Sequence, residues 1–362
     1  MEFIINKKII VDVLSEFVVI LKENPIRPIL NGIKITTEGE NLKFLGTNLE
    51  IDLIKTVPAE IIQHGGVVIK PNLILEYIKL MDQEEIKFKL QESTLYIHQA
   101  EFSVLNLESY PVVPVFESTE ITSLNGKELK EIFDKVKFVA SQNNDNLAIN
   151  VIRLQFKKDF SEFVATDSHR LIYLKKNIAS KEETSFSLPL DGVNSLSKLL
   201  KDEEDITINF SNGQAIFLWN NTYFSTKTIE LSFPAFENII NDNSFSKHME
   251  FNNSEIKSSL KKILAISKTS VDLKFGANFK FGSKKVQVQV NSGKAKLTEK
   301  FNVIMEGTEL TTSLNTKYLL DFISQIDNNV ILEGIDSNSK FKITELGDNS
   351  YQYIMMPLSM RS

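Results

Sequence analysis

Residues Thr166 to Arg170 place two hydroxyls, a carboxylate, an imidazole and a guanidinium side by side. Aspartate, serine and histidine are the groups of a nucleophilic hydrolase, but such a system brings them together from separate segments. We expect Asp167, Ser168 and His169 to be neighbours in one strand, with side chains that point alternately to opposite faces. The chain also has no GxSxG elbow, no phosphate-binding glycine loop and no HExxH motif. An enzyme is therefore the least favoured class, and we predict no catalytic residue.

Cofactor chemistry is not indicated either. The chain has no cysteine, which excludes disulfides, thiolate nucleophiles and cysteine-bound zinc. The four histidines are scattered without the spacing of metal ligands: His64, His98, His169 and His248. We predict no metal site and no cofactor.

The length of 362 residues and the 42% hydrophobic content predict large cores, divided over two or three domains. No apolar run approaches the roughly 18 to 20 residues of a membrane span, and the first residues lack the order of a signal peptide. We therefore expect a cytoplasmic protein without a membrane partner.

The positions with the clearest structural signal repeat along the chain. Asn6, Asn125 and Asn252 each follow a strand-like segment and precede an amphipathic helical pattern, at separations of 119 and 127 residues. Each asparagine suits a helix N-cap, because its side-chain oxygen can accept a hydrogen bond from an unpaired backbone N–H. A second helical pattern begins in each third near residues 70, 189 and 314, and a polar turn and an alternating strand follow it.

The ends of the three thirds are also alike. Pro111, Pro234 and Pro357 each follow an apolar residue and are 123 residues apart. We predict an α+β protein of three repeated domains, residues 1–118, 119–247 and 248–362, each with two helices against antiparallel sheets. Each domain divides into two half-units, so six helices would form one face of a curved array and sheets the other.

The charge is unevenly distributed. The chain carries −6 with a pI near 5.5, whereas the six helix windows sum to +6 and the remainder to −12. The windows are 6–22, 71–81, 125–137, 190–201, 252–268 and 315–326. Helix lysines are most often simply solvated, but a basic helical layer could also meet a phosphate backbone without reading bases. The acidity elsewhere would then keep other surfaces off nucleic acid.

Four motifs together carry a resemblance that covers the whole chain. The segment ATDSHRL at 165–171 is similar to an ATDGHRLA signature, SFPAFENII at 232–240 to an FP-containing loop, YIMMPL at 353–358 to a hydrophobic-Met-Pro ending, and NPIRPILNGIKI at 24–35 to the loop and strand after a first helix. These are motifs of the bacterial sliding clamp, the β subunit of DNA polymerase III. The resemblance implies a head-to-tail ring of two chains around duplex DNA, with helices inside, no nucleotide and no chemistry. It also implies a clamp loader and other replication and repair proteins as partners.

The resemblance implies functional residues as well. A pocket for QLxLF-like partner peptides would contain Thr166, His169, Arg170, Leu171, Pro234, Ile239, Ile354, Met356, Pro357 and Leu358. The residues expected to face DNA are Arg27, Lys127, Lys130, Lys198, Lys201, Lys257, Lys261 and Lys268. The subunit interface would include Phe102 and Ile266.

Several positions depart from the family pattern. Ser168 stands where glycine is usual, and Asn238 stands where the loop has an arginine. Asn24 aligns with a DNA-contacting arginine, which Arg27 could replace. A tyrosine pair of some relatives falls at Ala148 and Ile149, and the ending Ser359-Met360-Arg361 leaves the terminal basic contact open.

The leading hypothesis is thus a DNA sliding clamp that confers processivity on the replicative polymerase. The alternative is a repeat-built interaction scaffold that never encircles DNA.

Overall fold

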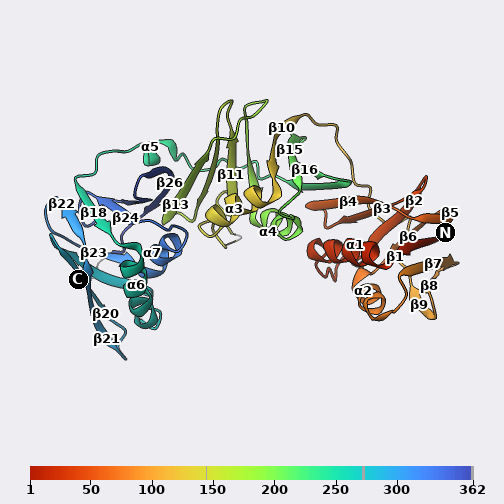
Figure 1. Ribbon diagram of the computed structural model, residues 1–362, viewed down its shortest axis with the longest axis horizontal. Coiled ribbons are helices and arrows are strands. Elements are labelled where there is room, and N and C mark those ends of the chain that lie inside the picture. The colour runs from red at the N-terminus through yellow and green to blue at the C-terminus, as the bar shows by residue number, and fades with distance from the viewer. Residues whose placement is uncertain (144, 271–273, 360–362) are drawn as a thin grey trace. The chain divides into compact units, whose positions relative to one another are not determined.

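The structure, a computed structural model, describes residues 1–143, 145–270 and 274–359 (Figure 1). The chain forms two compact units. Unit 1 comprises residues 1–133 and 179–230, and unit 2 comprises residues 134–178 and 231–362.

All six helices expected from the sequence are present. They are α1 (Lys7–Ile20), α2 (Pro71–Leu80), α3 (Gly126–Lys137), α4 (Leu190–Leu199), α6 (Asn253–Ser267) and α7 (Thr316–Ile323). The side-chain oxygens of Asn6, Asn125 and Asn252 accept hydrogen bonds of 2.9, 3.0 and 3.1 Å from backbone N–H groups in the first turns, which confirms the three predicted caps. The short helices η1 (Pro28–Asn31) and α5 (Glu237–Ile240) were not expected.

Unit 1 contains two antiparallel sheets. One has the order β5-β1-β7-β8-β9 and the other β10-β15-β16-β17-β4-β3-β2-β6. Their strands, with β14, are β1 (Glu2–Asn6), β2 (Ile33–Glu38), β3 (Asn41–Thr47), β4 (Ile51–Pro58), β5 (Glu60–Gln63), β6 (Gly66–Ile69), β7 (Glu85–Gln91), β8 (Thr94–Ile97), β9 (Ala100–Ser103), β10 (Glu120–Asn125), β14 (Thr184–Pro189), β15 (Asp205–Ser211), β16 (Gln214–Trp219) and β17 (Thr222–Lys227).

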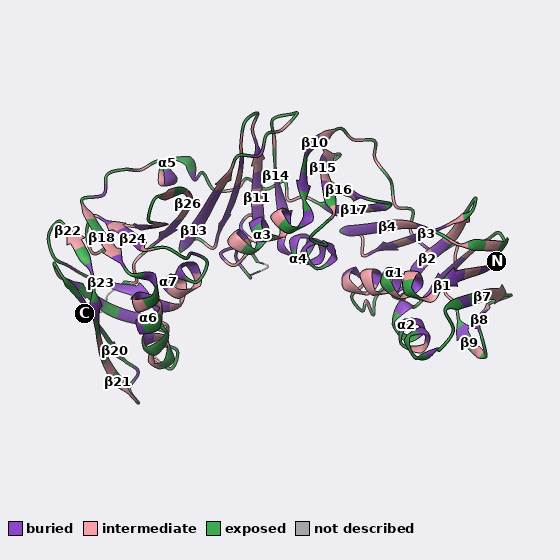
Figure 2. Cartoon of the chain, viewed as in Figure 1, coloured by how far each residue is buried: buried purple, intermediate pink, exposed green. Residues whose placement is uncertain are grey.

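The core of unit 1 lies between these sheets and the helices α1, α2 and α4. The buried face of α1 includes Phe17, whose ring packs against Gly46 on β3. A Cβ atom at Gly46 would lie 2.6 Å from that ring, so the close approach of helix and strand requires glycine. Alternate positions are buried in β1, β3 and β8, whereas the first four residues of β4 and of β16 are all buried. Figure 2 colours the residues by burial.

Unit 2 is built in the same way. One sheet contains the order β11-β12-β13-β26-β25-β24-β18-β22, and the other is β21-β20-β19-β23. The strands are β11 (Val151–Phe156), β12 (Ser161–Thr166), β13 (Arg170–Lys176), β18 (Lys247–Phe251), β19 (Gly276–Phe281), β20 (Lys285–Asn291), β21 (Lys296–Asn302), β22 (Ile304–Glu306), β23 (Leu310–Asn315), β24 (Val330–Gly334), β25 (Phe341–Glu345) and β26 (Asp348–Met355). Helices α6 and α7 pack against each other, and α6 covers β20 and β21.

In each unit, strands of the middle third of the chain pair with strands of a terminal third. In unit 1, β17 pairs with β4 in antiparallel register, and we call this junction the first seam. In unit 2, β13 pairs with β26, which forms the second seam. The backbone ladder of each large sheet therefore continues from one third to the next.

No helix in the described ranges 1–143, 145–270 and 274–359 is long and apolar enough to cross a membrane.

Candidate functional site

Asp167, Ser168 and His169 lie in the tight turn between β12, which ends at Thr166, and β13, not in one strand as expected. The Asp167 carboxylate accepts 3.0 Å hydrogen bonds from the backbone N–H groups of His169 and Arg170. Ser168 occupies the left-handed region with φ of 75°. The aspartate thus serves to hold the turn, and it is not hydrogen-bonded to the imidazole in the way a catalytic triad requires.

Arg170 begins β13 and is buried, with its guanidinium in a network of fixed partners. It donates to the carboxylates of Asp167 at 2.9 Å and Asp321 at 3.1 Å, and to the Phe138 carbonyl at 3.1 Å. The guanidinium also lies 3.9 Å from the centre of the Tyr318 ring. Because several charged and aromatic partners surround it, Arg170 fixes the turn against α7.

This turn forms one side of a pocket of about 320 Å³ within unit 2. Eight of the ten residues expected at the peptide site line it: Thr166, His169, Arg170, Leu171, Pro234, Ile239, Ile354 and Met356. Ser168, Ala235 and Lys340 complete the lining. Segments from the β12–β13 turn, the α5 segment and the end of β26 are therefore brought together, although they are far apart in the sequence.

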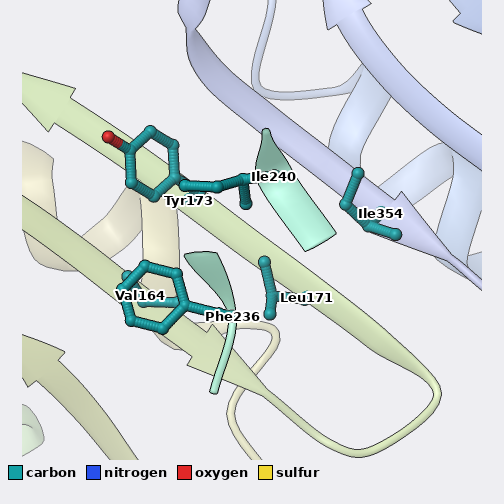
Figure 3. Packing of buried hydrophobic residues seen from close by; sticks show 6 residues of the cluster. All are labelled: Val164, Leu171, Tyr173, Phe236, Ile240 and Ile354. Atoms are coloured by element: carbon teal, nitrogen blue, oxygen red, sulfur yellow. The ribbon is translucent and has the colours of Figure 1, made fainter. Parts of the chain in front are cut away.

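The floor of the pocket is apolar. Leu171 on β13 lies opposite Ile354 on β26 in the second seam. These two residues belong to a buried cluster that includes Phe236 and Ile240 from the α5 segment and Tyr173 from β13 (Figure 3). The α5 segment is thus held over the strands by its own buried side chains, while Met356 remains 45% exposed at the edge. Such a surface can receive leucine and phenylalanine side chains, and an exposed methionine can adapt to more than one ligand.

Lys340 is a pocket residue that the motifs did not indicate. It precedes β25, and its ammonium lies 2.7 Å from the Asp242 carboxylate, just after α5. The lysine holds the pKa of Asp242 well below its usual range. The pair therefore ties the α5 segment to the start of β25, the strand that pairs with β26.

Two predicted pocket residues do not line the cavity. Pro357 and Leu358 follow β26, and the Leu358 backbone N–H donates to the Ser313 carbonyl at 2.8 Å beside β23. Asn238 is exposed on α5. Met360 and Arg361 lie outside the described residues.

Most of the residues expected to face DNA are exposed, and all lie on or next to helices. In unit 1 these are Arg27, before η1, Lys127 and Lys130 on α3, and Lys198 and Lys201 on or after α4. In unit 2 they are Lys257, Lys261 and Lys268 on or after α6. Lys130 and Lys257 are half-buried, and Lys201 lies 3.6 Å from the Glu16 carboxylate.

Of the two expected interface residues, Phe102 on β9 is buried against the Tyr77 ring at 5.6 Å. Ile266 on α6 is half-buried. In the described part of the chain, no three histidine, aspartate or glutamate side chains gather as metal ligands would.

Sequence comparison identifies the family to which this fold and pocket correspond. Three successive domains of the DNA polymerase III beta subunit match: the N-terminal domain at residues 1–114, the central domain at 123–235 and the C-terminal domain at 242–359. The protein is therefore of the DNA sliding clamp class, built from three clamp domains. The chain belongs to the DNA polymerase III beta subunit family. Proteins of the sliding clamp family are processivity factors, and membership of the family implies no catalytic activity.

Relatives match over nearly the whole chain. The chain is 24% identical over 380 residues to the beta sliding clamp of Staphylococcus epidermidis, with 99% of each chain covered. It is 26% identical over 356 residues to that of Halalkalibacterium halodurans, with 91% of this chain and 92% of the relative covered.

The fold is shared with solved structures. The sliding clamp of Bacillus subtilis has a TM-score of 0.91 at 20% identity, with full coverage of both chains. A DNA polymerase III beta subunit of Pseudomonas aeruginosa, solved bound to griselimycin, has a TM-score of 0.90 at 20% identity, with 99% of this chain and 100% of the other covered.

Proposed function

We propose that two copies of this chain form a head-to-tail ring that encircles duplex DNA, and that the pocket in unit 2 tethers the replicative polymerase, the clamp loader and repair proteins through QLxLF-like peptides. The convergence of three separate motifs on one apolar pocket is the observation that carries this proposal. The proposal includes three clamp domains with boundaries at 1–118, 119–247 and 248–362.

The pocket suits a short peptide rather than a large rigid surface. Its volume of about 320 Å³ accommodates one or two large apolar side chains. The polar groups of Thr166 and His169 stand at the turn, while Leu171 and Ile354 provide the apolar floor. A peptide that ends in a leucine and a phenylalanine would bury both side chains there.

A direct test uses a fluorescent QLxLF peptide and Met356→Asp. This residue is 45% exposed, so a carboxylate there should leave the fold intact but should face the apolar side chains of the bound peptide. We expect affinity to fall at least tenfold. Leu346→Asp is the matched control, because Leu346 is 47% exposed in the same unit and outside the pocket. Equal affinities of wild type and Met356→Asp would refute the peptide site.

Two exposed sheet edges support the ring. β9 ends the five-stranded sheet of unit 1, and β21 ends the four-stranded sheet of unit 2. Unpaired edges can add a strand from a second chain. On α2, Leu73 is 63% and Leu80 is 85% exposed, on the same helix as Tyr77, which contacts Phe102 on β9. An apolar helix surface next to an open edge is typical of a subunit interface.

The ring predicts a species near twice 41.2 kDa in sedimentation. The double variant Leu73→Glu, Leu80→Glu should sediment as a monomer with an unchanged circular dichroism spectrum, because two charges would enter the apolar interface. Ile62→Glu is a control at another apolar position, 49% exposed and distant in sequence. A wild type that is monomeric at micromolar concentration would contradict the ring.

The helix lysines would meet phosphates without base contacts, which allows sliding. Loading onto nicked circular DNA distinguishes a clamp that encircles DNA from a scaffold that binds only the outside of the DNA. A ring should dissociate after the circle is linearised, because topology retains it, whereas a surface-bound scaffold should stay.

A further inference from the structure

Strands β19 to β21 and their turns carry a high net positive charge. Residues 274–302 contain seven lysines and one acidic residue, a net charge of +6 that equals that of the six helix windows together. The chain as a whole carries −6. The expectation that positive charge is confined to the helices, with acidity elsewhere, is therefore wrong for this segment.

The strand register places the lysines with neutral polar side chains on one face. Lys280 pairs with Gln287, and Gln287 pairs with Lys300, so these three form a row across β19, β20 and β21. All three point to the same side, because directly opposite residues share a face. The neighbouring row consists of Asn278, Gln289 and Thr298. We call this outward side of β19, β20 and β21 the lysine face.

The only carboxylate of the segment lies on the other side. Glu299 is adjacent to Lys300 in β21 and therefore points to the opposite face. There it accepts hydrogen bonds from Lys262 at 2.7 Å and Ser259 at 3.4 Å, both on α6, and its side chain is 17% exposed. In Figure 1, β20 and β21 lie beside α6, which covers that inner side. The lysine face thus has no acidic residue among its strand positions.

The lysines of these strands and their turns form no ion pair with the part of the chain that the structure describes. None of them forms an ion pair within residues 1–143, 145–270 and 274–359, and all are exposed. They are Lys280, Lys284, Lys285, Lys294, Lys296 and Lys300. Their positive charges are therefore available to a ligand from outside.

The side chains of the face favour phosphate over a protein partner. Protein interfaces depend on aromatic and apolar anchors, but Phe279, Phe281 and Phe301 are buried on the inner side. The same burial removes the aromatic platforms on which unpaired bases stack. Lysine ammonium, amide and hydroxyl groups, which remain, are the groups that contact phosphate and sugar in nucleic acids.

We propose that the lysine face is a second binding surface for the phosphate backbone of duplex nucleic acid, separate from the helix lysines and independent of base sequence. A strand of seven residues is about 23 Å long, which matches the length of about seven base pairs. Pairing of the β21 edge with another strand would leave this face open, since the edge and the face are perpendicular. The inference therefore does not depend on the ring.

The test uses the full chain and a fluorescein-labelled linear duplex of 20 base pairs in an anisotropy titration at several salt concentrations. The triple variant Lys280→Gln, Lys296→Gln, Lys300→Gln should bind about tenfold more weakly at low salt. The slope of log K against log salt should decrease by about 3, because each phosphate contact contributes close to one unit. The same three positions changed to Arg should keep the wild-type affinity, which separates charge from folding.

Two further variants locate the effect. Lys43→Gln, Lys181→Gln, Lys227→Gln removes the same charge at lysines that each face a carboxylate, and it should change affinity less than twofold. Lys257→Gln, Lys261→Gln, Lys268→Gln tests the helix lysines separately, and its loss should add to that of the lysine-face variant.

Three outcomes would overturn the proposal. The first is unchanged affinity and slope for the lysine-face variant. The second is an equal loss in the control triple, which would indicate a long-range effect of net charge. The third is a lysine face that binds a poly-glutamate peptide while duplex binding stays unchanged, which would assign the surface to acidic proteins.

Discussion

The two seams use the same turn for different purposes. In unit 1 the turn Thr47–Ile51 joins β3 to β4, and in unit 2 the turn Thr166–Arg170 joins β12 to β13. Asn48 accepts backbone hydrogen bonds of 3.0 and 2.7 Å from the residues two and three positions on. Asp167 accepts the equivalent bonds at 3.0 Å each. The side chain thus sets the turn in both units.

The correspondence extends to the strand that pairs across each seam. The Glu50 carbonyl accepts from the Lys227 N–H at 2.9 Å, and the His169 carbonyl accepts from the Met356 N–H at 2.9 Å. The backbones of the two seams are therefore equivalent at the point where the second seam borders the pocket.

The difference lies in the side chains that face each other across the seam. In the first seam, buried Asp52 lies opposite Ser225 and accepts hydrogen bonds from that hydroxyl at 3.1 Å and from Thr47 at 2.5 Å. The corresponding pair in the second seam is Leu171 and Ile354. The polar side chains of the first seam satisfy one another's hydrogen bonds, and the side chains of the second seam form the apolar floor of the pocket. Because the scaffold is shared, exchanging these side chains tests which features make the pocket.

The largest expected effect comes from Arg170→Met. This change leaves Asp167 and Asp321 without their shared buried cation, and we expect a loss of about 3 to 5 kcal/mol in the free energy of unfolding. Ile51→Met is the matched control, because Ile51 is the equivalent residue of the first seam and is itself a buried apolar side chain; the change should cost less than about 1.5 kcal/mol. Urea titrations measure both, and equal losses would show that the network adds nothing to the second seam.

The next effect comes from giving the second seam the side chain of the first. Leu171→Asp buries a carboxyl group opposite Ile354, where the donor that Ser225 provides in unit 1 is missing, and the nearby Thr166 hydroxyl already donates to the Arg170 carbonyl. We therefore expect a loss of about 2 to 3 kcal/mol and no peptide binding. Adding Ile354→Ser supplies the donor that Ser225 provides in unit 1. The double variant should regain part of the stability but not the peptide binding, as double-mutant analysis of melts and anisotropy would show. A double variant less stable than Leu171→Asp would mean that the seams are not interchangeable.

A carboxyl of the first seam and a carboxyl near the pocket should respond oppositely to pH. Burial raises the pKa of the Asp52 carboxyl above its ordinary 3.8, so the stability it contributes is present at low pH and is lost as the pH rises through the raised pKa. Near the pocket, the Lys340 ammonium lowers the pKa of Asp242, so that contribution is present above pH 3.8 and is lost as the pH falls.

Thermal melts from pH 3 to pH 7 distinguish the two carboxyls. Asp52→Asn should remove a decline in melting temperature with rising pH, and Asp242→Asn should remove a rise over the acidic part of the range. The same pH profile in both variants would contradict the assignment of opposite signs.

These features differ in how far the sequence predicts them. The six helices and the caps at Asn6, Asn125 and Asn252 follow from local periodicity and local hydrogen bonding, which a sequence records directly. Eight pocket residues were found because three motifs resemble those of a family. Lys340 was missed because its contact with Asp242 joins segments almost a hundred residues apart, and no local pattern marks it.

Other features escape the sequence because a net charge does not show which way the side chains point. A single sum of charge over everything outside the helices conceals the basic strands, in which the adjacent residues Glu299 and Lys300 point to opposite faces. The turn at Asp167–His169 is not predicted by alternation, which describes regular strands and not an aspartate whose side chain accepts hydrogen bonds from the backbone just after it. The partners of Arg170 on α7 depend on tertiary packing alone.

The smallest expected effect concerns the left-handed residue in both turns. Leu49 and Ser168 each have φ of 75°, a region that a side chain disfavours and glycine adopts freely. Ser168→Gly should raise the free energy of unfolding by about 0.5 to 1 kcal/mol, because relief of strain exceeds the added entropy of the unfolded chain. Ser168→Ala keeps the Cβ atom and should give no gain. Leu49→Gly should gain less, because Leu49 is half-buried and glycine removes its packing. Urea titration of the three variants measures these differences, and a gain for Ser168→Ala as large as for glycine would place the cause in the serine hydroxyl instead of the backbone.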